Sequence, residues 1–170
     1  MSETQVHDDP ALMSMQIRSA VKPSEGRLVP YAAQCLLCLH DHEKTGAASV
    51  RMETSQLRNF MAACNACDDP RLVQVWVLYQ MSRHKEWCSR PGDQGGTDHM
   101  FGHQIVGLFT KADGRIHELA NSLRLSEHQR REATMQLLRA FAGQLARLHS
   151  YVKKDGDWDT IERIANEVKS

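Results

Sequence analysis

Residues 126–154, SEHQRREATMQLLRAFAGQLARLHSYVKK, carry a long helical pattern. Ser126 and Gln129 form a capping box, in which the hydroxyl accepts from a free N–H of the first turn and the amide reaches back to the cap. Apolar residues then recur at helical spacing without a proline, at Met135, Leu138, Ala142, Leu145, Leu148 and Val152. The pattern predicts an amphipathic helix of about seven turns around which the fold is organised.

The other face of this helix is basic. It carries Arg130, Arg131, Arg139, Arg147 and Lys154. A long helix with an apolar stripe and an arginine-bearing flank indicates a surface that meets a partner.

Length and composition limit the possible classes of protein. A chain of 170 residues with a hydrophobic share of 41% can bury one core. Lys plus Arg and Asp plus Glu are equal at 21 each, so nucleic-acid affinity would need local clustering of basic residues. The polar start has no signal-peptide core, and we expect a cytoplasmic protein without a membrane segment. Five cysteines then indicate reduced thiols.

Outward from the long helix, the chain predicts an all-α, compact bundle of about five helices. Residues 1–27 are expected to be a partly disordered N-terminal segment, with only a docking turn at residues 11–17, and residues 28–170 a single helical domain. Helices are predicted over 31–44, over 56–67 with a cap at Thr54 or Ser55, over 99–123 with an interruption at 113–114, and as a short amphipathic turn from Trp158 to Val168.

The segment Leu72–Met81 is apolar nearly all round. Asp69 is its expected N-cap, and Pro70 suits the first helical position. Since no other segment resembles a strand partner, we predict a helix here, and expect it to be the most buried one. The stretch 89–97, SRPGDQGGT, follows as a mobile loop.

Two groups of residues could hold a metal. Four thiols in two pairs, at Cys35, Cys38, Cys64 and Cys67, resemble a zinc signature. Both pairs lie inside apolar helical patterns, which favours cysteines buried in the core. The pairs His99/His103 and His128/Glu132 each share a helical face, as a metal centre in a bundle requires. The sequence favours no metal and no cofactor, with a metal-binding helical protein as the alternative.

Catalytic motifs are missing from the sequence, which contains no Gly-x-Ser-x-Gly elbow and no phosphate-binding glycine loop in a strand–loop–helix setting. We therefore do not expect an enzyme. The basic residues are better suited to holding a phosphate backbone, because guanidinium groups on rigid helices can do so without reading bases. A helical protein-interaction module remains a further alternative.

Three short motifs resemble a known family. They are residues 54–60 (TSQLRNF), residues 78–83 (LYQMSR) and the helix end at residues 141–151. Together they are similar to the small subunit of type III (Csm-type) CRISPR effector complexes. The chain departs from that pattern at Gln144, Leu148 and Ser150, and residues 28–44 have no part in the match.

The resemblance implies a non-catalytic, all-helical subunit of an antiviral ribonucleoprotein. Such a subunit stacks in several copies as a filament, meets other CRISPR effector subunits, and contacts guide RNA and target RNA without sequence specificity. Arg58 and Arg83 carry over from the motifs as RNA-binding residues. Arg51, Lys85 and Arg90 join them because of their proximity in the sequence.

Overall fold

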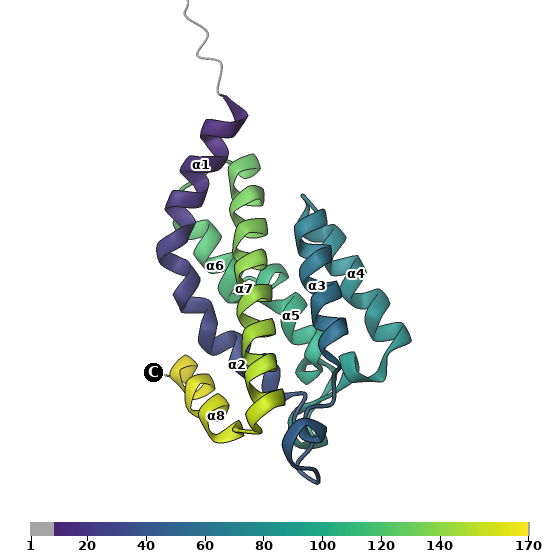
Figure 1. Ribbon diagram of the computed structural model, residues 1–170. Helices are drawn as coiled ribbons and strands as arrows, with labels where there is room; N and C mark the ends of the chain where they lie inside the picture. Colours follow the sequence, from purple (N-terminus) through teal and green to yellow (C-terminus); the bar gives the residue numbers. More distant parts are fainter. Residues whose placement is uncertain (1–8, 170) are drawn as a thin grey trace, which may run out of the picture.

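Helix α7, Glu127–Asp155, lies at the centre of the fold (Figure 1). The structure is a computed structural model and describes residues 9–169. The predicted capping box is confirmed: Ser126 Oγ accepts from the Gln129 N–H at 3.3 Å, and Gln129 Oε1 accepts from the Ser126 N–H at 3.1 Å. Gly156 ends the helix with φ 65°, a left-handed conformation that glycine adopts at low cost.

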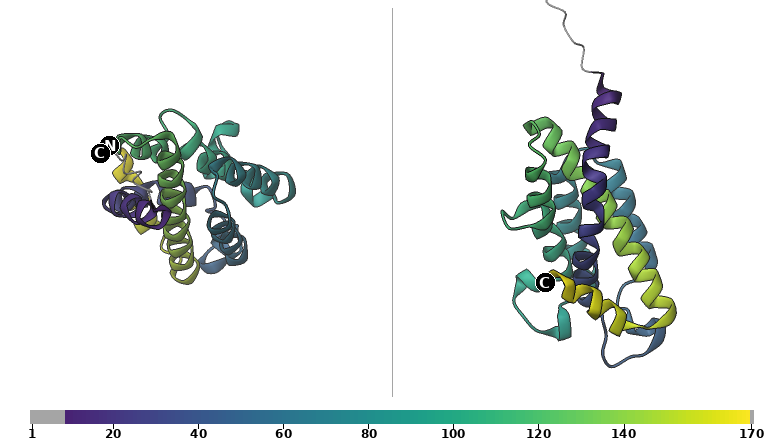
Figure 2. Two further views of the ribbon diagram at one scale, coloured as in Figure 1. Left: turned by 90° about the horizontal axis from the view of Figure 1, so that it is seen from above. Right: turned by 90° about the vertical axis from the view of Figure 1, so that its left-hand side faces the viewer.

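The other helices surround α7. Its closest partners are α1 (Pro10–Val21), α2 (Val29–Leu37), α3 (Thr54–Ala66) and α6 (Arg115–Ser122). Figure 2 shows α1 and α2 on one side of α7, and α3 with α4 (Pro70–Arg83) on the other. Two more helices complete the bundle: α5 (Phe101–Thr110) packs on α4 and α6, and α8 (Trp158–Asn166) packs on α2. The prediction of an all-α compact bundle is confirmed.

Aromatic side chains fill the core between α3, α4 and α5. The Trp87 ring lies 5.2 Å from Phe101 and 6.0 Å from Phe60, measured between centroids. Its Nε1 donates a hydrogen bond of 2.9 Å to Gln56 Oε1, so the buried indole N–H has a partner. Phe141 of α7 is also fully buried. None of the helices within residues 9–169 combines the length and the apolar composition that a bilayer crossing requires.

The N-terminal part is more ordered than the sequence predicts. Residues 11–17 belong to helix α1, so the prediction of a mere docking turn is wrong. Asp9 caps this helix, and Ile17 and Val21 bury their side chains in the common core. The helical path continues through residues 22–28 into α2, so the predicted boundary at residue 27 falls inside it. Residues 1–8, where disorder is also predicted, lie outside the described residues.

Two helix boundaries also differ from prediction. The helix predicted over 31–44 ends at Leu37, because the chain then turns back and His40 pairs with Val50 in an isolated bridge. The helix predicted over 99–123 is two helices, α5 and α6, separated at the predicted interruption. Helix α3 starts at Thr54 with Glu53 as its N-cap, so neither Thr54 nor Ser55 is the cap.

Helix α4 forms as predicted, with Asp69 as its N-cap and Pro70 in the first turn. It is not the most buried helix. Only Val73 and Val77 are buried in it, whereas four large apolar side chains remain 41% to 64% exposed: Leu72, Val75, Leu78 and Tyr79. We call these four residues the α4 stripe. The central buried position belongs to α7 instead.

Candidate nucleic-acid interface

The five predicted RNA-binding residues lie in three separate places. Arg51, Lys85 and Arg90 line one hollow, together with residues of the 41–50 loop. Arg58 lies on α3 in a groove against α7. Arg83 lies in the last turn of α4. The predicted set is therefore not a single site.

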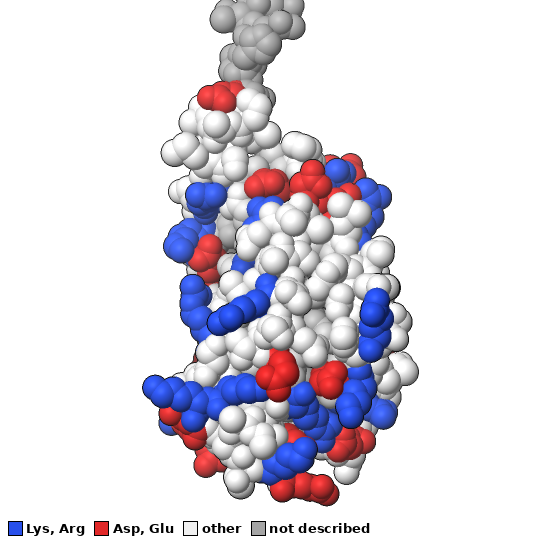
Figure 3. Space-filling view, turned by 45° about the vertical axis from the view of Figure 1, so that its right-hand side comes forward, with Lys and Arg blue, Asp and Glu red and all other residues white. Residues whose placement is uncertain are grey.

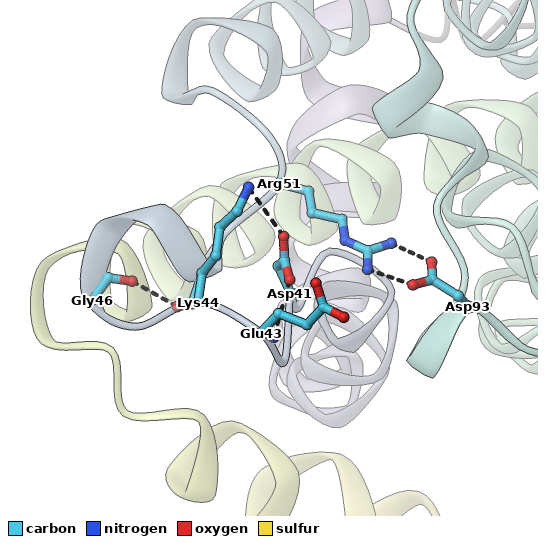
Figure 4. A network of polar contacts seen from close by, with 7 residues as sticks. Asp41, Glu43, Lys44, Gly46, Arg51 and Asp93 are labelled. Atoms are coloured by element: carbon cyan, nitrogen blue, oxygen red, sulfur yellow. Dashed lines mark hydrogen bonds and ion pairs between the residues drawn. The ribbon is translucent and has the colours of Figure 1, made fainter.

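The hollow around Arg51 has an open volume of about 870 Å³ and a mixed charge. Arg51 donates from both terminal nitrogens to Asp93, at 2.5 and 2.8 Å (Figure 4). This hydrogen bonding raises the pKa of Arg51 and lowers the pKa of Asp93. Nearby, Lys44 pairs with Asp41 at 3.3 Å. Arg51 thus joins the 41–50 loop to the turn at Pro91–Asp93.

The lining of the hollow contains more carboxylates than cations. The basic residues are Lys44, Arg51, Lys85 and Arg90, and the acidic ones are Asp41, Glu43, Glu53, Glu86 and Asp93. A phosphate would meet repulsion from these carboxylates, and Arg51 already has its counter-charge. Arg90 also donates to Gly95 O at 2.7 Å. The hollow therefore suits a phosphate backbone poorly.

Arg83 makes local contacts on α4. It donates to the Tyr79 hydroxyl at 2.6 Å, and its guanidinium carbon lies 5.5 Å from the centre of the Tyr79 ring. Since Tyr79 belongs to the α4 stripe, Arg83 marks the end of an apolar surface. This position fits a protein contact at least as well as an RNA contact.

The groove between α3 and α7 has a different character. Its volume is about 400 Å³, and its charged lining is Arg58 from one wall and Arg147 from the other, with no Asp or Glu among the lining residues. The floor is apolar or small: Leu57, Met61, Gly143 and Ala146. Thr54 and Ser150 add hydroxyl groups. We call this the α3–α7 groove.

Polar contacts at both ends of α3 fix the walls of this groove. Near its start, His149 Nε2 donates to Met52 O at 2.8 Å, and Lys153 pairs with Glu53 at 3.1 Å. Near its end, Arg139 donates to Cys64 O at 3.0 Å and to Cys67 O at 2.9 Å. Because these bonds join α3 to α7, Arg58 and Arg147 are held on a rigid frame.

Charge on the surrounding face is interspersed. Figure 3 shows positive and negative side chains mixed over the lower part of this side of the molecule, and a largely uncharged area above them. A broad basic patch is therefore not what would attract RNA here. Any phosphate contact depends on individual arginines in a suitable setting.

The cysteine pairs are core residues. Cys35, Cys38 and Cys64 are buried, and Cys67 is partly so. Burial raises the pKa of Cys35 well above its ordinary value, and raises the pKa of Cys38 and of Cys64 to about 12. These three thiols therefore behave as small apolar side chains packed in the core.

The histidine pairs do not assemble into a centre either. Glu132 accepts a hydrogen bond from Gln136 at 2.9 Å, one turn along α7. Within the part of the chain that the structure describes, no three His, Cys, Asp or Glu side chains are grouped so as to hold a metal ion. Residues 9–169 therefore contain no group of ligand side chains that would support the metal-binding alternative.

Known proteins offer no match to this chain. No family model matches it, and no curated protein or solved structure matches it significantly. The expected relation to Csm-type small subunits therefore has no support from these comparisons.

Sequence reasoning missed two features of this surface. From the sequence, Arg147 was only one member of a basic flank, although it lines the same groove as Arg58. The signal that could have singled it out is Gly143, four residues earlier, since a glycine inside a long helix needs a reason. The second is the α4 stripe, whose apolar residues were expected inside the bundle.

Proposed function

We propose that this chain is a non-catalytic small subunit of a type III CRISPR ribonucleoprotein, acting in the cytoplasm in antiviral defence. It contacts the backbone of guide RNA and target RNA without sequence specificity, and it assembles with other effector subunits and with copies of itself. The observation that carries the proposal is the α3–α7 groove, which Arg58 of the family-like motif and Arg147 both line without a carboxylate among the lining residues.

Two guanidinium groups on facing walls suit a nucleic-acid backbone. Arginine binds phosphate oxygens through a planar fork of N–H donors, and it stays charged at any physiological pH. The groove is formed by regular helices that tertiary hydrogen bonds hold in place. Such an arrangement recognises phosphates and shape, while sequence is read by base pairing between the two RNA strands.

Exposed apolar residues on two sides of the bundle support self-association. Helix α4, which carries the stripe, lies on one side of α7, and helix α1 lies on the other (Figures 1 and 2). On α1, Leu12 is 54% and Met15 is 68% exposed. Contact between the stripe of one copy and α1 of the next is a heterologous contact, which generates an open array rather than a closed dimer. This arrangement is what a filament of stacked copies needs.

Salt-dependent RNA binding tests the proposal. The double variant Arg58→Ala/Arg147→Ala should weaken binding of short RNA and lower the slope of log affinity against log salt by about two, one for each lost phosphate contact. The control Arg18→Ala/Arg163→Ala removes two exposed arginines from α1 and α8 and should leave both quantities unchanged. Arg83→Ala, measured alongside, tests the other motif arginine.

Co-purification tests the wider assignment. Recovery of the tagged chain with large CRISPR subunits and a short guide RNA would support it. A chain recovered alone, with unchanged RNA affinity in the Arg58/Arg147 double variant, would refute it.

A further inference from the structure

Gly143 occupies the middle of α7, where glycine costs stability. A glycine inside a helix is less favourable than an alanine, because it loses more backbone freedom on folding. A methyl group at this position would meet only Arg147 Nη1 at 3.7 Å, which is an ordinary contact. Packing within residues 9–169 therefore does not require a glycine here.

Two other glycines in the bundle, Gly114 and Gly102, have an internal reason. A methyl group on Gly114 would overlap the backbone of Gly107 and Leu108, and one on Gly102 would overlap the Met81 side chain. Gly143 has no such internal neighbour: it lines the α3–α7 groove, and the nearest group to an added methyl is the flexible Arg147 guanidinium. The missing side chain therefore leaves room in the groove beside that guanidinium.

The floor around this point is apolar and shallow. Leu57 and Met61 come from α3, and Ala146 lies beside Gly143 on α7. A volume of about 400 Å³ is at the low end of sites that take small ligands, so it suits one nucleotide rather than a long segment. Planar bases pack their faces on apolar side chains with little regard to sequence.

We infer that the floor of the α3–α7 groove is a nucleoside subsite, in which one unstacked base of the bound RNA packs over Gly143 against the partly exposed Met61 and Ala146. The phosphates on either side of that nucleotide contact Arg58 and Arg147. This inference rests on the proposed RNA-binding function and adds to it a contact that backbone recognition alone does not need.

Abasic RNA distinguishes a base subsite from recognition of the phosphate backbone alone, because it keeps every phosphate and lacks the bases. Fluorescence anisotropy of the purified full-length chain is measured with a six-nucleotide single-stranded RNA and with its abasic counterpart. The intact RNA should bind roughly tenfold more tightly, as expected when a base contact is lost. In the variant Gly143→Leu, whose side chain covers the floor, this difference should fall to less than about twofold.

Matched variants guard against effects on folding. Gly107→Leu, in α5, also replaces a helical glycine whose added side chain meets only a flexible lysine, and it should keep the tenfold preference. Gly143→Ala fills the floor by a single methyl group and should give an intermediate preference, with a thermal midpoint no lower than that of the natural chain.

The possible results fall into distinct classes. Equal affinity of the natural chain for intact and abasic RNA, with binding still dependent on Arg58 and Arg147, would overturn the subsite and leave the proposed function standing. An unchanged preference in Gly143→Leu would also overturn the subsite. Binding of poly-glutamate, with no binding of either RNA, would overturn both the subsite and the proposed RNA-binding function. The groove would then be a site for an acidic peptide.

Discussion

The Arg139 guanidinium on α7 donates a hydrogen bond of 3.0 Å to the carbonyl oxygen of Cys64 on α3, and a second one, of 2.9 Å, to Cys67. The last carbonyl groups of a helix have no partner within it and carry partial negative charge. Arg139 therefore caps α3 from a neighbouring helix. An arginine expected to face a partner is used inside the fold, and it fixes one end of the α3–α7 groove.

Replacing Arg139 should destabilise the fold. Arg139→Met keeps much of the aliphatic stem and removes both charge-assisted hydrogen bonds, so we expect the free energy of unfolding to fall by about 2–3 kcal/mol. Urea denaturation measures this change. Arg131→Met, at an exposed position of the same helix, is the control and should stay within about 0.5 kcal/mol of the natural chain. Similar values for both variants would contradict the capping role.

The central helix was predictable from sequence because its signals are local. The Ser126 cap, the apolar spacing and the glycine stop lie within one stretch, and none depends on the rest of the fold. The apolar stripe also decides which face is buried, since Met135, Leu138 and Leu145 are fully buried. The all-α class follows from the same kind of pattern in the other segments.

The place of α4 was not predictable in this way. A helix that is apolar nearly all round is expected at the centre of a domain, provided that the chain itself covers all its faces. Only the Val73 and Val77 face is covered here, whereas Val75 is 64% exposed. The apolar pattern indicates that a surface is buried by some contact, and it does not indicate whether the same chain or another molecule makes that contact.

The candidate site was predictable only in part. Arg58 could be named from its motif, but the pairing of Arg51 with Asp93 joins residues distant in sequence. Such a pairing depends on how the loops meet, so the sequence could not show that the Arg51 charge is neutralised. The presence of Arg58 and Arg147 in one groove depends in the same way on the packing of α3 against α7.

A charge on the α4 stripe should block self-association. Val75→Glu places a carboxylate on a surface that would otherwise be buried between copies, and burying an unpaired charge is costly. We expect sedimentation analysis to show monomers where the natural chain forms larger species. Asn121→Glu, at an exposed position on α6, is the control and should assemble normally.

The proposed contact between α4 of one copy and α1 of the next also predicts how a mixture of two variants assembles. Met15→Glu on α1 should block assembly just as Val75→Glu does, because each variant loses one of two complementary surfaces. Mixed together, the two variants should form dimers and nothing larger, since one intact surface remains on each chain. Monomers alone in the mixture, or a natural chain that is monomeric at high concentration, would contradict the stacking of α4 on α1.

Acidification should weaken the fold through His149. This side chain is fully buried, its Nε2 donates to Met52 O and its Nδ1 has no partner, so protonation would add a buried N–H without an acceptor. Burial lowers the pKa of His149 below its ordinary 6.5. As pH falls below about 6.5, the unfolded chain takes up a proton that the folded chain does not, and stability is lost by up to about 1.4 kcal/mol per pH unit.

Chemical denaturation between pH 7.5 and 5.5 measures this loss. His149→Gln keeps a donor for Met52 O and cannot titrate, so the unfolding free energy of this variant should depend less steeply on pH. His128→Gln removes an exposed histidine at the start of α7 and serves as the control. Equal pH slopes for the natural chain and His149→Gln would rule out His149 as the source.

Substitution by alanine should change the free energy of unfolding in opposite directions at Gly143 and at Gly114. Gly143→Ala relieves the entropic cost of glycine in α7 without a clash, so the free energy of unfolding should rise by roughly 0.5–1 kcal/mol. Gly114→Ala drives a methyl group into the carbonyl oxygens of Gly107 and Leu108, where the backbone has to move, and should lower it by about 1–3 kcal/mol.

Urea titrations of the two single variants decide this comparison, with Gly107→Ala as a second helical glycine whose neighbour is a flexible lysine. A stabilised Gly143→Ala chain that binds RNA less well would show that the glycine is kept for what lies in the groove. A destabilised Gly143→Ala chain would mean that the fold itself needs the glycine, and the argument for an open floor would lose its basis.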